Sequence, residues 1–117
     1  MNYGFIKVAA ASPNVTVANP DKNSDEIIKA VRTAADLGVK LLVTPELGVT
    51  GYTCGDLFLQ KRLYESSMSA LRKIMNETAP FDIVTIVGVP LKVGSRLYIC
   101  AAVIYKGELL GVVPQRN

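Results

Sequence analysis

The stretch L-L-V-T-P-E-L-G-V-T-G-Y-T-C-G-D-L-F, residues 41–58, predicts the centre of the fold and one candidate site. Its first three residues are apolar, which is typical of a short strand covered on both faces. Because proline cannot donate a hydrogen bond to a sheet ladder, the strand is expected to end at Pro45. Glu46 follows directly, so it stands at the carboxyl end of the strand, where α/β proteins place their ligand sites.

The segment after Glu46 is rich in glycine. Gly48, Gly51 and Gly55 fall within eight residues. Residues without a Cβ let a chain turn tightly and let its backbone approach a ligand closely. A carboxylate followed by such a segment predicts a loop with a binding or catalytic role at the end of the strand.

The residues before this strand predict a strand–helix–strand unit. Residues 5–11, F-I-K-V-A-A-A, are mostly apolar and are followed by a Ser-Pro pair, which indicates a first strand. Apolar residues at helical spacing then predict a helix from Ser24 to about Leu37. Asn23 or Ser24 is expected to cap the start of this helix, and Gly38 is expected to end it. The short connections favour parallel strands.

A second helix is predicted after the glycine-rich segment. It is expected to begin after Asp56, which can cap it, and to continue to about Thr78, before Pro80 stops it. Its apolar stripe, which we interpret as core packing, consists of Tyr64, Met68, Leu71 and Met75.

Three strands are predicted after the second helix. The β-branched run I-V-T-I-V-G-V-P, residues 83–90, indicates a central strand that ends at its proline. Residues 97–105 and 108–113 are expected to form a hairpin around Lys106-Gly107, in which Gly107 supplies a positive φ. The complete pattern predicts an α/β fold with a mixed sheet and two main helices.

Composition excludes several classes of protein. The chain has 117 residues, of which 50% are hydrophobic, enough for one domain with a core. The net charge of +3 comes from dispersed Lys and Arg residues, so no nucleic-acid partner is expected. No apolar run is long enough for a membrane helix, and no signal peptide is expected. The chain lacks histidine, which excludes His-based triads, and its two cysteines do not form a disulfide framework. We therefore expect a cytoplasmic protein.

The motifs also resemble a known family. The first strand, the P-E-L-G-V-T-G-Y segment and the K-G-E-L-L-G-V-V-P hairpin are similar, in this order, to the nitrilase superfamily of carbon-nitrogen hydrolases. The continuation Y-T-C-G-D-L-F resembles more narrowly the glutaminase domain of glutamine-dependent NAD synthetases. The superfamily fold is an α-β-β-α sandwich. The resemblance implies that residues 1–117 form the first half of such a domain.

The resemblance implies roles for individual residues. The family uses a Glu, a Lys and a Cys, and Glu46 falls on the position of the Glu, which acts as general base and acid. Tyr52 matches a tyrosine that contacts the substrate glutamine. The family lysine is expected after V-V-P, where this sequence has Gln115, and the nucleophilic cysteine is expected beyond residue 117.

Neither cysteine of this chain is expected to replace that nucleophile. Cys54 lies within Y-T-C-G-D, where the family cysteine is not the nucleophile. Cys100 lies inside an apolar run and is interpreted as a small core residue. With one of the three catalytic residues, the chain alone is expected to be inactive.

The resemblance also implies cofactors and partners. In the family, ammonia from glutamine passes to a synthetase domain that uses ATP and Mg²⁺ to form NAD. This chain has no phosphate-binding Gly-Lys-Ser/Thr loop, so no cofactor is expected in the chain itself. The expected partners are glutamine, the remainder of the glutaminase domain and a synthetase domain.

An alternative is a non-catalytic interaction module of the same fold. A sheet with helices on one face leaves an apolar second face, which soluble monomers rarely expose. We therefore expect a homo-oligomer. The residues predicted to contribute to this face are Val84, Ile86, Leu97, Ile99, Ala101 and Val103. A third interpretation, another branch of the nitrilase superfamily, is disfavoured by Y-T-C-G-D-L-F.

Overall fold

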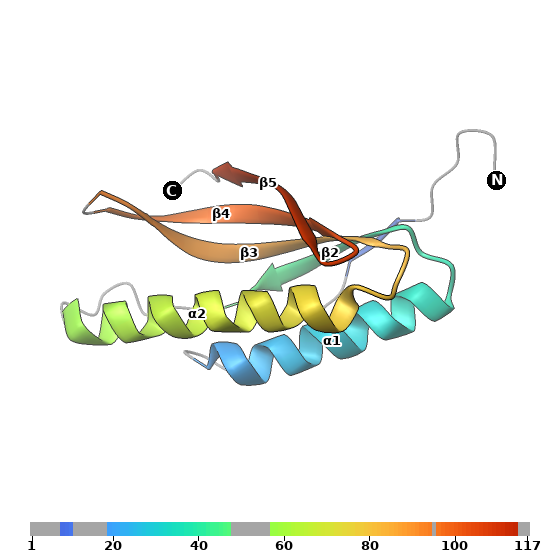
Figure 1. Cartoon of the computed structure of the whole chain (residues 1–117), viewed down its shortest axis with the longest axis horizontal. Coiled ribbons are helices and arrows are strands. Elements are labelled where there is room, and N and C mark those ends of the chain that lie inside the picture. The colour runs from blue at the N-terminus through green and yellow to red at the C-terminus, as the bar shows by residue number, and fades with distance from the viewer. Residues whose placement is uncertain (1–7, 11–18, 48–56, 95, 115–117) are drawn as a thin grey trace.

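The computed structural model describes residues 8–10, 19–47, 57–94 and 96–114. Its strands form one five-stranded mixed sheet in sequence order, and both helices lie side by side on one face of that sheet (Figure 1). The elements are β1 Val8–Ala10, α1 Pro20–Asp36, β2 Leu41–Glu46, α2 Leu57–Thr78, β3 Val84–Val93, β4 Arg96–Tyr105 and β5 Glu108–Pro114. The predicted α/β class with two helices is confirmed.

The first three strands are parallel. β1 pairs with β2 through Ala9 and Leu42, and Leu42 pairs in turn with Thr85 of β3. The two helices connect these strands across one face of the sheet, as expected for consecutive βαβ units. The strand predicted for residues 5–11 is present as β1, and its remaining residues lie outside the described part of the chain.

The predicted start of α1 was wrong. The helix begins at Pro20, and Asn19 caps it by accepting a hydrogen bond from the main-chain nitrogen of Lys22 at 3.1 Å. Proline suits the first helical position because its missing N–H has no partner there and its φ is already helical. Asn23 and Ser24, the predicted caps, lie inside the helix and are buried. Gly38, with φ +78°, follows the helix end as expected.

The helices bury their apolar faces against the sheet. Ile27 and Val31 of α1 meet Ile74 of α2 and Val87 of β3 in one core cluster. The apolar stripe of α2 is core packing, as expected. Leu71 is buried in that cluster, Met68 and Met75 are partly buried against it, and Tyr64 has intermediate exposure. The predicted end of α2 at Thr78 is confirmed, and the predicted cap Asp56 lies outside the described residues.

The expectation that Pro45 ends β2 was wrong, because the strand continues to Glu46. Val43 pairs with Ile86, but the next pair joins Glu46 to Gly88. β2 therefore contains one extra residue relative to β3, which is a bulge. A bulge is one of the few places where a strand tolerates proline, because a bulged residue makes no ladder bond.

β3 likewise continues beyond its proline, to Val93, contrary to the sequence-based expectation. The carbonyl of Gly88 accepts a hydrogen bond from the main chain of Leu47, so the polar main-chain groups of Gly88 face β2. Those of Pro90 face the same way, since the direction alternates along a strand. The described pairing with β2 ends at Gly88, so the missing N–H of Pro90 costs no described ladder bond.

Two antiparallel hairpins complete the sheet. Lys106 and Gly107 connect β4 to β5 with φ of +48° and +84°, the geometry of a two-residue turn with positive φ at both positions. This hairpin was predicted. β3 and β4 also pair as a hairpin, which was not predicted and which closes beside Gly94, whose φ is +62°. The Gly94-Ser95 dipeptide between two β-rich runs was the available signal.

The face of the sheet opposite the helices is called here the outer face. Thr85, Val87, Ala102 and Ile104 point toward the helices and are buried. Their neighbours on the outer face have intermediate exposure, as predicted by alternation. These are Val84, Ile86, Ile99, Ala101 and Val103, while the side chain of Leu97 lies outside the described part.

The strand at residues 41–43 was expected to be covered on both faces, and the structure differs. Leu42 is buried, but Val43 is 41% exposed on the outer face. The strand is therefore covered on one face by the described residues and not on both. β5 is exposed along its whole length, with Leu110 57% and Val113 56% exposed.

Candidate active site

Glu46 is the last residue of β2, at the carboxyl end of the parallel part of the sheet. It pairs with Gly88 of the neighbouring strand. The predicted placement at a strand end is thus confirmed for the main chain. The side chain of Glu46 lies outside the described part, so its catalytic role stays a prediction.

The bulge before Glu46 is closed by a side chain. Thr44 is 7% exposed, and its hydroxyl donates a hydrogen bond to the carbonyl of Ile86 at 3.0 Å. This contact lies where the register between the two strands changes. The hydroxyl supplies a donor at the interruption of the ladder, where a buried carbonyl would otherwise lose its partner.

The residue after Glu46 is held from two sides. The main-chain nitrogen of Leu47 donates to the carbonyl of Gly88 at 2.7 Å. The carbonyl of Leu47 accepts a hydrogen bond from Nδ2 of Asn23 at 2.9 Å. The side chain of Leu47 is fully buried in the core. The main chain of Glu46 is therefore flanked by residues anchored to β3 and to α1.

Sequence reasoning missed this function of Asn23, which it treated as a cap. The residue is 2% exposed and reaches across 24 positions of the sequence to Leu47. The available signal was its place on the apolar face of the helix, four residues before Ile27. A polar residue at such a position must find a buried partner, because an unpaired buried amide is costly.

Several predicted residues cannot be placed beside Glu46. Tyr52, Cys54 and Gln115 lie outside the described residues, so their roles stay predictions. Cys100 of β4 is a free cysteine, 4% exposed and buried with the core, which confirms its interpretation as a small core residue.

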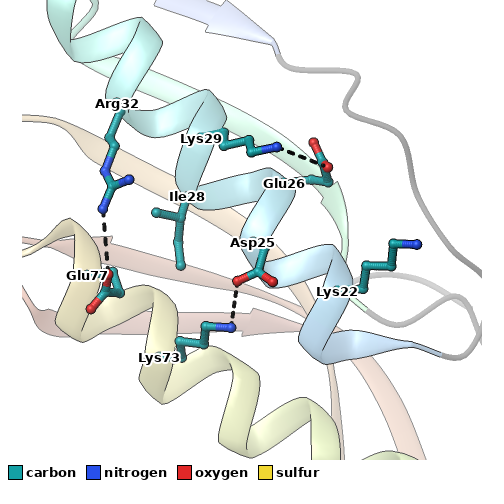
Figure 2. A pocket seen from close by; sticks show the side chains of 8 residues that line it. All are labelled: Lys22, Asp25, Glu26, Ile28, Lys29, Arg32, Lys73 and Glu77. Carbon is teal, nitrogen blue, oxygen red and sulfur yellow. Dashed lines mark ion pairs between the residues drawn. The ribbon is translucent and has the colours of Figure 1, made fainter.

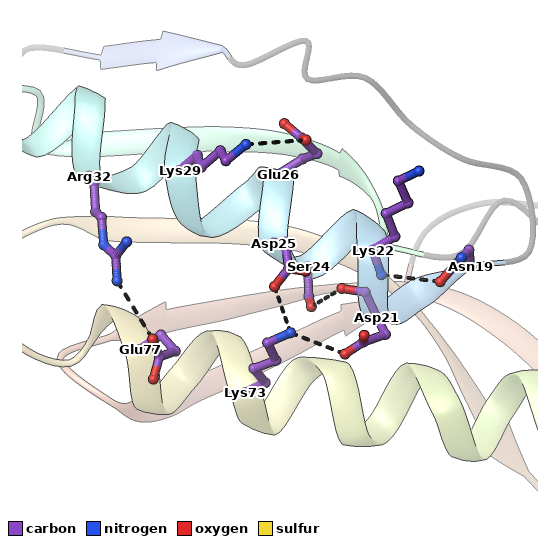
Figure 3. A network of polar contacts seen from close by, with 10 residues as sticks. All are labelled: Asn19, Asp21, Lys22, Ser24, Asp25, Glu26, Lys29, Arg32, Lys73 and Glu77. Atoms are coloured by element: carbon purple, nitrogen blue, oxygen red, sulfur yellow. Dashed lines mark hydrogen bonds and ion pairs between the residues drawn. The ribbon is translucent and has the colours of Figure 1, made fainter.

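A charged groove runs between α1 and α2 (Figure 2). It is lined by Lys22, Asp25, Glu26, Ile28, Lys29, Arg32, Lys73 and Glu77. Lys73 contacts Asp25 at 2.6 Å and Asp21 at 3.1 Å, and Arg32 contacts Glu77 at 3.6 Å. Figure 3 shows that the Lys73 contacts join the two helices near the capped start of α1, and that the Arg32 contact joins them further along. The pairing of opposite charges indicates a contact between helices rather than a catalytic site.

The pKa shifts in the described residues have local causes. The pKa of Lys73 is raised because its ammonium group bonds the carboxylates of Asp25 and Asp21. At the amino end of β3, the Tyr105 hydroxyl donates to Asp82 at 2.5 Å, and Lys40 contacts the same carboxylate at 3.2 Å. These contacts lower the pKa of Asp82, and the same carboxylate raises the pKa of Tyr105. This second cluster lies at the opposite end of the strands from Glu46.

A metal site and a membrane-spanning helix are both absent from the described ranges. Those residues contain no group of three or more His, Cys, Asp or Glu side chains that could hold a metal ion. Neither of the two described helices combines the length and apolar character that crossing a membrane requires.

The chain is similar to known proteins along almost its whole length. The carbon-nitrogen hydrolase family profile matches residues 7–116. A relative from Mycobacterium tuberculosis, named glutamine-dependent NAD(+) synthetase, is 37% identical over 113 residues, which are 97% of this chain. The match covers 17% of that relative, so the chain spans less than a fifth of its length.

Solved structures agree with this similarity. A glutamine-dependent NAD(+) synthetase from Cytophaga hutchinsonii has a TM-score of 0.80 and 28% identity, over 96% of this chain and 19% of that one. An amidase from Nesterenkonia sp. has a TM-score of 0.70 and 24% identity over 96% of this chain and 43% of its own, which shows a shared fold. Two helices on a mixed sheet thus correspond to part of the nitrilase-like α/β fold. With nearly every residue inside the family match, this chain belongs to the carbon-nitrogen hydrolase family.

Proposed function

We propose that residues 1–117 form part of a glutaminase domain and supply the general base, Glu46, of a glutamine-dependent NAD synthetase. The observation that carries the proposal is the 37% identity, over 97% of the chain, to a protein of that name. The main-chain position of Glu46, at the carboxyl end of a parallel strand, supports the assignment.

The proposed reaction is hydrolysis of the side-chain amide of glutamine. Glu46 accepts the proton of a cysteine thiol, and the resulting thiolate attacks the amide carbon. The carboxylic acid then returns a proton to the departing ammonia, and a thioester remains. Glu46 next accepts a proton from water as the water attacks the thioester. The cysteine leaves as a thiolate, which takes that proton back from Glu46, and glutamate is released. Tyr52 contacts the substrate in this proposal.

The proposal assigns the nucleophile to a residue outside these 117 residues, so the chain alone does not turn over glutamine. Its partners are the rest of the glutaminase domain and a synthetase domain. That second domain uses ATP and Mg²⁺ with the released ammonia.

Glu46→Gln in the full-length protein tests the proposal. The substitution keeps the size of the side chain and removes its basicity. Glutamine-dependent NAD formation should fall by at least about 10²-fold, the lower range for loss of a general base. NAD formation from free ammonia should be retained, because the synthetase domain is unchanged. Glutamine-dependent turnover within about tenfold of the parent would reject Glu46 as the base.

A second candidate function is an interaction module, and the exposed outer face favours it. The described side chains on this face include Val43, Ile86 and Val103, none of which is charged. A second copy of the chain offers the same largely apolar face, and a two-fold arrangement would cover both. We therefore propose self-association of this chain through the outer face and β5.

Sedimentation of the 117-residue chain tests self-association. Val113, which pairs with Ala101 and is 56% exposed, provides the disruptive variant Val113→Lys. Leu37→Lys is the matched control, because Leu37 is 62% exposed at the end of α1, which lies on the other face of the sheet (Figure 1). The parent chain and the Leu37→Lys control should form dimers, and Val113→Lys should dimerise more weakly than either. A monomeric parent at high micromolar concentration would contradict the proposal.

A further inference from the structure

Asn23 connects two parts of the molecule that the sequence places far apart. Its side chain lies in the second turn of α1 and is 2% exposed. Its Nδ2 atom donates to the carbonyl of Leu47 at 2.9 Å. Leu47 directly follows Glu46, so this contact fixes the main chain at the point where the strand passes into the glycine-rich segment.

The neighbouring contacts complete this arrangement. Two positions before Glu46, the hydroxyl of Thr44 is bonded to Ile86 across the bulge. One position after it, the main-chain nitrogen of Leu47 is bonded to Gly88. β3 therefore constrains both sides of Glu46, but the carbonyl of Leu47 points to another layer, the helix. The donor on that side comes from Asn23, so the direction in which the chain leaves Glu46 depends on α1.

We infer that Asn23 is a positioning residue for Glu46, acting through the carbonyl of Leu47. The carbonyl of Leu47 belongs to the peptide group that follows Leu47, and its bond to Asn23 restricts rotation of that group. The bond from the Leu47 nitrogen to Gly88 restricts the peptide group that joins Glu46 to Leu47. Without the Asn23 amide the buried carbonyl would lose its partner, so Leu47 would be held less firmly, and with it the main chain of Glu46. This inference rests on the proposed role of Glu46, and it goes further by assigning a positioning function to a helix residue.

A matched control variant distinguishes positioning of Glu46 from a purely structural role of Asn23. Ser24, the next residue, is also buried, but its hydroxyl donates to the carbonyl of Asp21 within the same helix at 2.6 Å. Ser24→Ala therefore removes a hydrogen bond from the same turn without touching Leu47. It is the matched control for Asn23→Leu, which keeps a similar volume and removes the donor.

Steady-state kinetics of the full-length protein provide the test. With Asn23→Leu, kcat for glutamine-dependent NAD formation should fall by about 10²-fold, the expected effect of a misplaced catalytic group. KM for glutamine and ammonia-dependent turnover should change by less than about threefold, since neither depends on the orientation of Glu46. Ser24→Ala should change kcat, KM for glutamine and ammonia-dependent turnover by less than about threefold.

Hydrogen exchange provides a readout that does not depend on activity. In Asn23→Leu, the Leu47 amide bonded to Gly88 should exchange faster than in the parent, whereas Ser24→Ala should leave it unchanged. If Asn23→Leu does not fold, Asn23→Ala removes the donor and introduces no branched or charged group into the buried site. The same kinetic loss is then expected.

The outcomes separate the inference from the proposed function. If Glu46→Gln leaves glutamine turnover intact, the proposed base fails, and the inference fails with it. If Glu46→Gln is inactive but the Asn23 variant behaves like Ser24→Ala, only the inference is overturned. An equal loss of glutamine-dependent and ammonia-dependent turnover would show a general structural role and would also overturn it.

Discussion

The carboxyl end of β2 and the groove between α1 and α2 hold polar contacts of opposite character. Asn23 contacts Leu47 at 2.9 Å, and both residues are buried. Lys73 contacts Asp25 at the shorter distance of 2.6 Å, but these side chains are 36% and 54% exposed. Solvent screens exposed ion pairs, whereas a buried group that loses its partner pays the whole desolvation cost. We therefore expect the exposed fraction of the side chains, rather than the distance between the atoms, to decide how much each contact contributes to stability.

Leu47→Ala should produce the largest loss of stability. The side chain of Leu47 is fully buried, so its truncation leaves a cavity in the core below Glu46. The free energy of unfolding should fall by about 2–5 kcal/mol, as for other buried leucines. Urea denaturation measures this change. The control Leu37→Ala, at a position 62% exposed, should change it by less than about 0.5 kcal/mol. Equal effects of both substitutions would show that burial of the side chain does not decide the loss of stability.

Thr44→Val should have an intermediate effect. The substitution preserves the shape of the side chain and removes the donor to the carbonyl of Ile86. A buried carbonyl left without this partner should cost about 1–3 kcal/mol. Thr33→Val, at an exposed position of α1, is the matched control and should cost less than about 0.5 kcal/mol. A neutral Thr44→Val variant would show that solvent or the main chain replaces the lost donor.

Lys73→Met should cause the smallest loss of stability, and it tests the exposed ion pairs of the groove. It removes contacts with two carboxylates, yet the loss should be no more than about 1 kcal/mol, because the pairs are exposed. The difference from the parent should decrease further in high salt. A loss of several kcal/mol, or one insensitive to salt, would contradict the ranking by burial.

The Lys73 contribution should also depend on pH. Its pKa in the folded protein is raised above 10.5 by the two carboxylates. A raised pKa means that the stabilisation is fully present below the pKa of the unfolded chain. It is then lost as pH rises through the higher pKa of the folded state. Denaturation of the parent and Lys73→Met should therefore differ at neutral pH and converge in strongly alkaline solution.

Much of the fold follows from local patterns. Helical spacing predicted α2, and Pro80 predicted its end at about Thr78. The strand–helix–strand order predicted the parallel pairing of β1 and β2. Turn chemistry predicted the hairpin at Lys106-Gly107. These features depend on residues a few positions apart, whose preferences are already present in the sequence. The placement of Glu46 at a strand end was predictable for the same reason.

The tertiary structure decided the features that depend on distant partners. Whether Pro45 ended β2 depended on a bulge against β3, and whether Asn23 capped a helix or bonded Leu47 depended on contacts 24 residues away. The outer face was predictable by alternation, but its exposure depended on which layers cover the sheet. The sequence by itself determined the elements, their order and the family motif around Glu46. Only the packed chain showed what anchors that residue, because a buried hydrogen bond is defined by the partner that folding brings to it.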